Sequence, residues 1–163
     1  MTSTYVNWGQ AKVKLTWREA IQLPEYDLIT SVHGLCFYKG KLLLVNLNHR
    51  GWDIPGGHIE QDETPEQCFK REAMEEGYVE GECVLLGHVI VDHSENSQWD
   101  ESSPYPKLGY QVYYRMNIKN MHDFEGKFES AERILIDPIR VSDYFKGWHE
   151  VLALVVKCAL KEG

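Results

Sequence analysis

Alternating apolar and polar residues predict that strands make up most of this chain. Lys12–Trp17 places three apolar side chains on one face, as in a half-buried strand. Ile29–Leu47 reads as two strands around a turn at Lys39-Gly40-Lys41. A long polar loop, Glu95–Lys107, separates two further apolar segments. The remaining predicted strands are the short Gly51–Gly57, then Cys83–Ser94, Leu108–Ile118 and Arg133–Pro138.

Two segments carry the sequence signals of helices. Thr64 and Gln67 form a T-x-x-Q capping box, which predicts a helix from Pro65 to about Glu76. An apolar stripe at helical spacing predicts a second helix from about Trp148 to Lys161, after a helical turn at Val141–Phe145. Because predicted strands outnumber predicted helices and three of them separate the two helices along the chain, we expect an α/β fold with a mixed sheet between helices.

Size and composition narrow the class of protein. The 163 residues suit one domain spanning residues 1–163, and the net charge of −8 disfavours binding to DNA or RNA polymers. A small phosphorylated ligand that arrives with a divalent cation is compatible with this charge. Four cysteines without a CxxC pair indicate free thiols, and the apolar runs are too short to span a membrane. We therefore expect a cytoplasmic protein with no membrane segment.

The first predicted helix carries an acidic face. Glu72, Glu75 and Glu76 are spaced i, i+3 and i+4, so their carboxylates lie on one side and repel one another. A hard divalent cation relieves this repulsion, and Mg²⁺ in particular bridges carboxylates to substrate phosphates. The alternative is a solvated acidic face that Lys70 and Arg71 partly neutralise.

The segment Gly57–Val79 resembles the Nudix box, G-x5-E-x7-R-E-U-x-E-E-x-G-U, where U is a bulky apolar residue. The preceding Trp52–Gly57 is similar to the strand-to-loop transition of that family. Two positions depart from the box: Ala73 is small, and Gly77-Tyr78 stands in place of the usual x-Gly. We expect Gly77 to take the left-handed conformation and the helix to end one residue early. Matches to the six fixed positions before that glycine are Gly57, Glu63, Arg71, Glu72, Glu75 and Glu76.

The resemblance implies a Nudix-like α/β/α sandwich and a metal-dependent hydrolase. It implies that Mg²⁺ or Mn²⁺ is held by Glu72, Glu75, Glu76 and the carbonyl of Gly56. It also implies that an ion pair between Glu63 and Arg71 pins the loop onto the helix, although an ordinary surface pair is the alternative interpretation. The residues to which the resemblance gives a role in the site are thus Gly56, Glu63, Arg71, Glu72, Glu75 and Glu76.

The general base stays open at this point. Some Nudix proteins use a glutamate of the box, and others use an acid from a later loop. We favour Glu75 or Glu76, with Glu129 and Glu132 as outside options. The loop acids Glu101 and Glu125 complete the candidates.

Three residues are candidates for substrate binding. His58 and Arg50 flank the glycine loop and are placed to approach phosphate, although exposed turns explain them as well. Trp99 lies in the loop Glu95–Lys107, where a mobile indole can stack on a nucleobase. A core edge or a contact in a homodimer is the alternative for this tryptophan.

The predicted reaction is hydrolysis of a nucleoside diphosphate linked to another group, X. By elimination, the favoured substrate is a nucleoside triphosphate, including an oxidised one, which gives a monophosphate and pyrophosphate. The acidic balance of the chain argues against an RNA end. Alternatives are a nucleoside diphosphate sugar hydrolase, a non-catalytic nucleotide-binding regulator, and an isomerase on the same scaffold.

Overall fold

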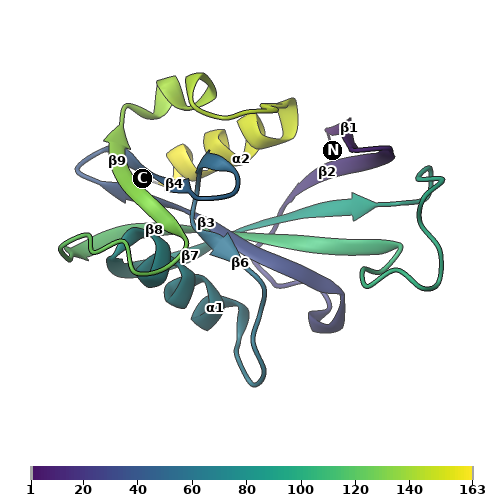
Figure 1. Ribbon diagram of the computed structural model, residues 1–163, viewed down its shortest axis with the longest axis horizontal. Helices are drawn as coiled ribbons and strands as arrows, with labels where there is room; N and C mark the ends of the chain where they lie inside the picture. The colour runs from purple at the N-terminus through teal and green to yellow at the C-terminus, as the bar shows by residue number, and fades with distance from the viewer. Residues whose placement is uncertain (1, 163) are drawn as a thin grey trace.

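Nine strands form one mixed sheet in the computed structural model, which describes residues 2–162 (Figure 1). The strand order is β1-β2-β7-β8-β3-β4-β5, with β6 beside β3 and β9 beside β4. Only β3 and β8 run parallel; the other pairs in these residues are antiparallel. The strands are β1 Ser3–Trp8, β2 Ala11–Glu19, β3 Ile29–Tyr38, β4 Lys41–Leu47, β5 Gly51–Asp53, β6 Gly56–Gly57, β7 Val79–Asp92, β8 Leu108–Met121 and β9 Ser130–Ile136.

Two α-helices cover opposite faces of this sheet, α1 (Pro65–Glu72) on one side and α2 (Glu150–Lys161) on the other (Figure 1). Helix α1 continues into η2 (Ala73–Gly77), a π-helical turn. Short 3-10 helices occupy η1 (Tyr26–Leu28) and η3 (Pro138–Asp143). The predicted α/β sandwich with a mixed sheet is therefore confirmed.

Most predicted strands are present with longer bounds. In the turn between β3 and β4, Lys39 and Gly40 both have positive φ, 50° and 78°, as a tight two-residue hairpin requires. Strand β1 was not predicted, because Ser3–Trp8 exposes most of both faces and has no buried apolar stripe. The second helix begins at Glu150 rather than Trp148, since His149 caps it by accepting a bond from the amide of Leu152 at 3.3 Å.

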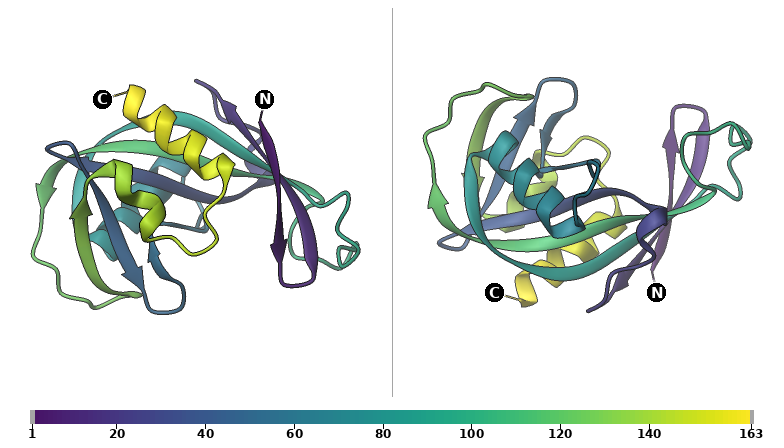
Figure 2. Two further views of the ribbon diagram at one scale, coloured as in Figure 1. Left: turned by 90° about the horizontal axis from the view of Figure 1, so that it is seen from above. Right: turned by 90° about the horizontal axis from the view of Figure 1, so that it is seen from below.

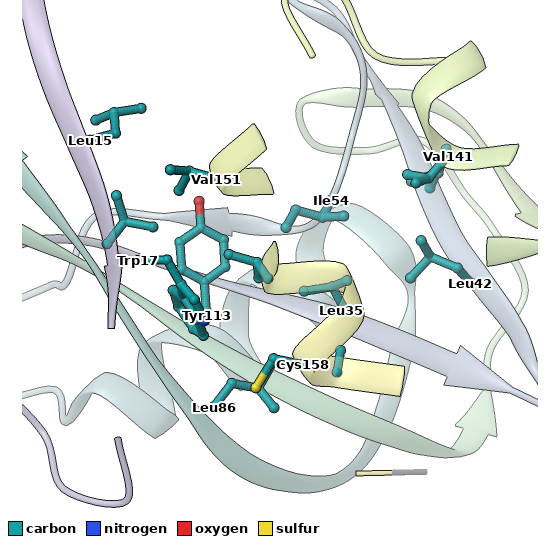
Figure 3. Packing of buried hydrophobic residues seen from close by; sticks show 14 of the residues in the cluster. Leu15, Trp17, Leu35, Leu42, Ile54, Leu86, Tyr113, Val141, Val151 and Cys158 are labelled. Carbon is teal, nitrogen blue, oxygen red and sulfur yellow. The ribbon is translucent and has the colours of Figure 1, made fainter. Parts of the chain in front are cut away.

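The core has one apolar layer on each face of the sheet. Figure 3 shows the layer under α2, where Trp17, Leu35 and Val151 pack together. On the other face, the ring of Phe69 from α1 lies directly over Gly34 of β3. A methyl group on Gly34 would come within 2.2 Å of that ring, so glycine here lets α1 sit close to the sheet. This close packing fixes the position of the helix that carries the acidic face.

The β1–β2 hairpin lies beside the loop that joins β7 to β8 (Figure 2). The hydroxyl of Tyr5 donates to Glu95 at 2.6 Å, and the amine of Lys12 lies 3.7 Å from the same carboxylate. The ring of Trp8 meets His93 edge-on with centroids 6.2 Å apart. The hairpin and the loop therefore form one end of the molecule together.

Two sequence predictions concern cysteines and membranes. All four cysteines are free thiols, as predicted. Within residues 2–162, no helix combines the length and the apolar character that a membrane crossing needs.

Candidate active site

Helix α1 begins as its sequence predicts. The hydroxyl of Thr64 accepts a bond from the amide of Gln67 at 3.1 Å, and the side chain of Gln67 accepts one from the amide of Thr64 at 2.9 Å. Both ends of the capping box are thus formed, and Pro65 fills the first helical position. The start of the acidic helix is set by local sequence alone.

The other end of the helix differs from the prediction. Gly77 does not take the left-handed conformation and the helix does not end early; it runs on through η2, and Tyr78 is left-handed, with φ 56° and ψ 42°. A side chain on Gly77 would meet Leu43 of β4 at 2.8 Å. The glycine is thus required for packing on the sheet, and the turn falls to the next residue.

Arg71 and Glu63 form a tight ion pair. The guanidinium donates to the two oxygens of Glu63 at 2.8 and 3.1 Å, and also to the carbonyl of His58 at 3.1 Å. The carboxylate in turn accepts from the amide of Glu60 at 3.0 Å. The hydrogen bond from Arg71 lowers the pKa of Glu63 below its ordinary value. This two-pronged geometry ties the loop before α1 to the helix.

The same guanidinium reaches two acids of the helix. It donates to Glu72 at 2.6 Å and to Glu75 at 3.4 Å. Burial nevertheless raises the pKa of Glu72, and the bond from Arg71 only partly offsets that effect. Arg71 therefore carries part of the neutralisation that the crowded carboxylates need.

Glu76 is buried without such a partner. Its side chain is 2% exposed, and its carboxylate accepts one hydrogen bond, from the amide of Gly56 at 2.9 Å. Among the described residues, no basic side chain forms a salt bridge with it. Burial raises the pKa of Glu76 to about 8, which the bond from Gly56 opposes and the nearby charge of Glu72 reinforces.

The two glycines of β6 bring backbone close to these acids. A methyl group on Gly57 would lie 2.7 Å from a carboxylate oxygen of Glu72, and one on Gly56 would lie 2.2 Å from the ring of His33. Burial lowers the pKa of His33 to about 4, so this imidazole is neutral. Glycine at both positions allows the loop to pass between the acidic helix and β3.

A cavity of about 650 Å³ joins these parts, a volume typical of small-molecule sites. Glu72, Glu75 and Glu76 lie together in its acidic wall. The far end lies at the hairpin and the β7–β8 loop, where the lining residues include Trp8, Val91, His93, Tyr105, Pro106 and Gln111.

Two of the three predicted substrate-binding residues line this cavity. Arg50 and His58 do, and His58 contacts the carbonyl of Thr30 at 2.8 Å through its Nδ1. Trp99 is not among the lining residues. Its indole N–H donates to the carbonyl of Tyr105 at 3.0 Å, and Tyr105 forms part of the wall instead.

Sequence reasoning missed Trp8 as a cavity aromatic, and within the loop Glu95–Lys107 it singled out Trp99 rather than Tyr105. Trp8 and Tyr105 are exposed, at 47% and 46%, despite their size. Trp8 stands next to Gly9 at the tip of a hairpin, and a large aromatic beside a tight turn is the only local signal it gives. That both residues line one cavity depends on a sheet register that the sequence does not reveal.

Of the candidate general bases outside the box, Glu129 lines the cavity. The others have different surroundings: the carboxylate of Glu132 accepts a bond from the amide group of Asn46 at 3.1 Å, and Glu125 pairs with Lys127 at 3.5 Å. Neither Glu132, Glu125 nor Glu101 belongs to the cavity lining.

The acidic wall suits a hard divalent cation by its chemistry. Carboxylate oxygens and a backbone carbonyl are the donors that Mg²⁺ prefers, and the buried charge of Glu76 lacks a counter-charge. In residues 2–162, no three such side chains already stand in ligand geometry. Glu72 and Glu75 point to Arg71 instead. The residues present fit the ion by their chemistry.

A family model and several solved structures are similar to this chain. The family model described as NUDIX domain matches residues 29–156. No curated protein sequence matches the chain. Among solved structures, a Bacillus subtilis pyrophosphohydrolase, BsRppH, solved as a point mutant, is similar at a TM-score of 0.75 and 22% identity, covering 100% of this chain and 98% of that one.

Two further structures share the fold at lower similarity. The NUDIX domain of Shewanella oneidensis NrtR, solved with ADP ribose, has a TM-score of 0.59 and 19% identity, with 82% of this chain and 87% of that chain covered. An ADP-ribose pyrophosphatase from Streptococcus suis has a TM-score of 0.53 and 19% identity, with 83% and 95% covered.

Proposed function

This chain belongs to the NUDIX domain family, and from that premise we propose that it is a divalent-metal-dependent pyrophosphohydrolase acting on a small nucleotide. The favoured substrate is a nucleoside triphosphate, ordinary or oxidised, which is split into a monophosphate and pyrophosphate. Four free thiols support a reducing compartment such as the cytoplasm.

One observation carries the proposal: the buried carboxylate of Glu76 in the wall of a ligand-sized cavity. Burying a charge without a counter-charge destabilises a fold, so such a group is retained where it has a use. A cation that binds only the native protein stabilises the fold and offsets this cost in folding free energy. Glu76, Glu72 and Glu75, together with the carbonyl of Gly56, are the residues we assign to that cation.

The chemistry follows from these positions. A bound Mg²⁺ or Mn²⁺ neutralises the charge of a diphosphate and polarises it for attack. In the reaction, a water oxygen forms a bond to phosphorus, the anhydride P–O bond breaks, and the proton from water passes through a carboxylate to solvent. We assign that proton transfer to Glu75 or Glu76, with Glu129 as the alternative in the same wall. Arg71 and Glu63 hold the helix and its loop together.

The rest of the cavity supports a nucleotide. Arg50 and His58 border the acidic wall, where they can contact phosphate. At the far end, Trp8 and Tyr105 present aromatic surfaces on which a planar base can stack. A nucleoside diphosphate sugar fits the same description and is the second candidate. It is favoured by the similarity to a NUDIX domain solved with ADP ribose and to an ADP-ribose pyrophosphatase.

A release assay across nucleotides decides among these substrates. The panel holds the ordinary nucleoside triphosphates, an oxidised triphosphate, ADP-ribose, a nucleoside diphosphate sugar and a 5′-triphosphorylated oligonucleotide, each with Mg²⁺ or Mn²⁺. We expect a triphosphate to give the highest kcat/KM. Faster release from ADP-ribose supports the second candidate, and an inert panel with Glu76 intact contradicts the proposed hydrolase.

Paired tryptophan variants test the base-binding end. Trp8→Ala removes a cavity aromatic, so we expect KM to rise about 5- to 100-fold while kcat stays nearly unchanged. This rise corresponds to the roughly 1–3 kcal/mol that stacking on one base contributes. Trp99→Ala is the matched variant, because Trp99 lies outside the cavity lining and contacts the carbonyl of Tyr105 and the amine of Lys107. A larger KM effect from Trp99→Ala than from Trp8→Ala reverses the assignment.

A further inference from the structure

Tyr78 ends the acidic helix in a backbone conformation that favours glycine. Its φ of 56° and ψ of 42° are left-handed, at the position where the Nudix box has its glycine. The side chain is nevertheless almost completely buried, with 6% of its surface exposed. A bulky residue persists in such a conformation only where its surroundings hold it there. The contacts of Tyr78 therefore indicate what the residue does.

Most of those contacts run to one segment, His122–Ser130, which we call the anchored segment; Arg133 of β9 also donates to the carbonyl of Tyr78 at 3.3 Å. The ring of Tyr78 meets Phe124 edge-on with centroids 5.0 Å apart. The Tyr78 hydroxyl accepts a bond from the amide of Lys127 at 2.9 Å, and its carbonyl accepts one from the amide of His122 at 2.8 Å. The ring of Phe128 lies tilted to that of Tyr78, with centroids 6.5 Å apart. One residue thus binds the segment at two backbone amides and two aromatic rings.

The anchored segment brings two residues to the cavity. Phe128 and Glu129 line it, and Glu129 shares the wall with Glu72 and Glu76. On the far side of Glu129, the hydroxyl of Ser130 donates to the carbonyl of Glu76 at 2.6 Å. Glu129 therefore lies between two attachments to the helix end, one at Tyr78 and one at Ser130.

The rest of the segment has little packing of its own. Most of its side chains are exposed to solvent, and it has no regular secondary structure before β9 begins. Segments with few buried contacts open at low free energy. On one side, Glu129 is held by β9, which begins at Ser130, and by the amide of Asn48, which donates to the carbonyl of Glu129 at 2.9 Å. On its other side, the path of the chain depends on the attachment to Tyr78.

We propose that Tyr78 is a positioning residue, which fixes the anchored segment to the helix end and so holds Glu129 at the reacting end of the cavity. The proposal rests on the proposed function. The proposal explains why this chain departs from the Nudix box at position 78. A glycine there suits the left-handed backbone better, but it cannot bind Lys127 or pack on Phe124.

Amide hydrogen exchange of the substrate-free protein tests the attachment. Tyr78→Phe keeps the ring and removes the acceptor for Lys127, whereas Tyr78→Gly removes both ring and hydroxyl. We expect exchange across the anchored segment to speed up in Tyr78→Phe and more in Tyr78→Gly. Lys39→Gly is the matched control, because Lys39 is also left-handed, at φ 50°, but lies in a hairpin turn outside the cavity lining. Unchanged exchange in the segment for both Tyr78 variants overturns the proposal.

A kinetic cycle with Glu129 tests the positioning. With saturating Mg²⁺, Tyr78→Gly should lower kcat about tenfold in the wild-type background and hardly at all beside Glu129→Gln, since two residues acting through one group are not additive. Tyr78→Phe should fall between wild type and Tyr78→Gly, and Lys39→Gly should match wild type. Equal losses from Tyr78→Gly in both backgrounds show a merely structural role and overturn the proposal. If the protein is inactive on every nucleotide, the proposed function is wrong. Hydrogen exchange is measured without substrate, so it still decides whether Tyr78 holds the segment.

Discussion

Glu63 and Glu76 belong to one sequence motif, yet the protein stabilises the charge of the first and not that of the second. Two bonds from Arg71 lower the pKa of Glu63, whereas burial with a single amide donor raises the pKa of Glu76 to about 8. A carboxylate with an arginine partner is satisfied within the protein. A buried carboxylate without a cation is satisfied only by a proton or by a ligand. The contrast separates a residue that holds the site together from one that is available to bind.

The largest expected difference between the two acids is in catalysis. Glu76→Gln keeps the shape and the acceptor for Gly56 but removes the charge, so we expect kcat to fall by at least about 100-fold through lost metal-dependent stabilisation of the transition state. The measurement is steady-state turnover at saturating Mg²⁺, with circular dichroism to show an intact fold. Turnover within threefold of wild type removes Glu76 from the metal site.

The second difference is in stability and its pH dependence. In the folded protein the pKa of Glu76 rises from 4.5 to about 8, so the native state binds more protons than the unfolded state between these values. Stability of the metal-free protein should therefore fall as pH rises through this window, by up to roughly 5 kcal/mol at about 1.4 kcal/mol per pKa unit. Glu76→Gln should remove that slope and be the more stable protein at pH 8.

Urea unfolding in a chelator at several pH values between 4.5 and 8 measures this effect. The comparison of Glu76→Gln with wild type isolates one group, because burial also raises the pKa of Glu72 and Asp53 and their slopes appear in both proteins. Parallel pH curves for the two proteins contradict the buried-charge account of Glu76.

Parts of this contrast are encoded locally and were predictable. The capping box at Thr64 and Gln67 and the spacing of Glu72, Glu75 and Glu76 follow from helix geometry alone. The layered α/β architecture followed from the order of apolar segments and is what the structure shows.

Other parts depend on contacts between distant segments. Gly77 packs on Leu43 and Tyr78 packs under Phe124, so the helix end is decided by tertiary packing and not by the glycine rule. Trp8 reaches the cavity because β1 pairs with β2 at one edge of the sheet, and no periodic apolar pattern marks β1. The burial of Glu76 is equally impossible to predict from the sequence, because Glu76 directly follows another glutamate in an acidic helix.

Breaking the ion pair gives the third difference, which is smaller. Glu63→Gln leaves Arg71 with a neutral and weaker hydrogen-bond acceptor. We therefore expect the protein to lose roughly 1.5–3 kcal/mol of unfolding free energy, as for hydrogen bonds to charged groups. The sign is opposite to that for Glu76→Gln at pH 8. Lys70→Gln is a matched control, since the Lys70–Glu66 pair is exposed on the same helix and should matter little. A stability loss in Lys70→Gln equal to that in Glu63→Gln points to helix charge in general and not to the ion pair.

The smallest expected effect is the thermal shift on adding metal. A cation bound only by the native state stabilises it by mass action, so millimolar Mn²⁺ or Mg²⁺ should raise the melting temperature of wild type by a few degrees. The rise should shrink in Glu72→Gln/Glu75→Gln and nearly vanish in Glu76→Gln, but it should persist in Glu63→Gln, whose carboxylate serves Arg71. Differential scanning fluorimetry with a chelator reference measures each shift. Equal shifts in wild type and Glu72→Gln/Glu75→Gln would place the metal elsewhere. A shift lost only in Glu63→Gln would make Glu63 the acid that binds the metal, and the contrast between Glu63 and Glu76 would be reversed.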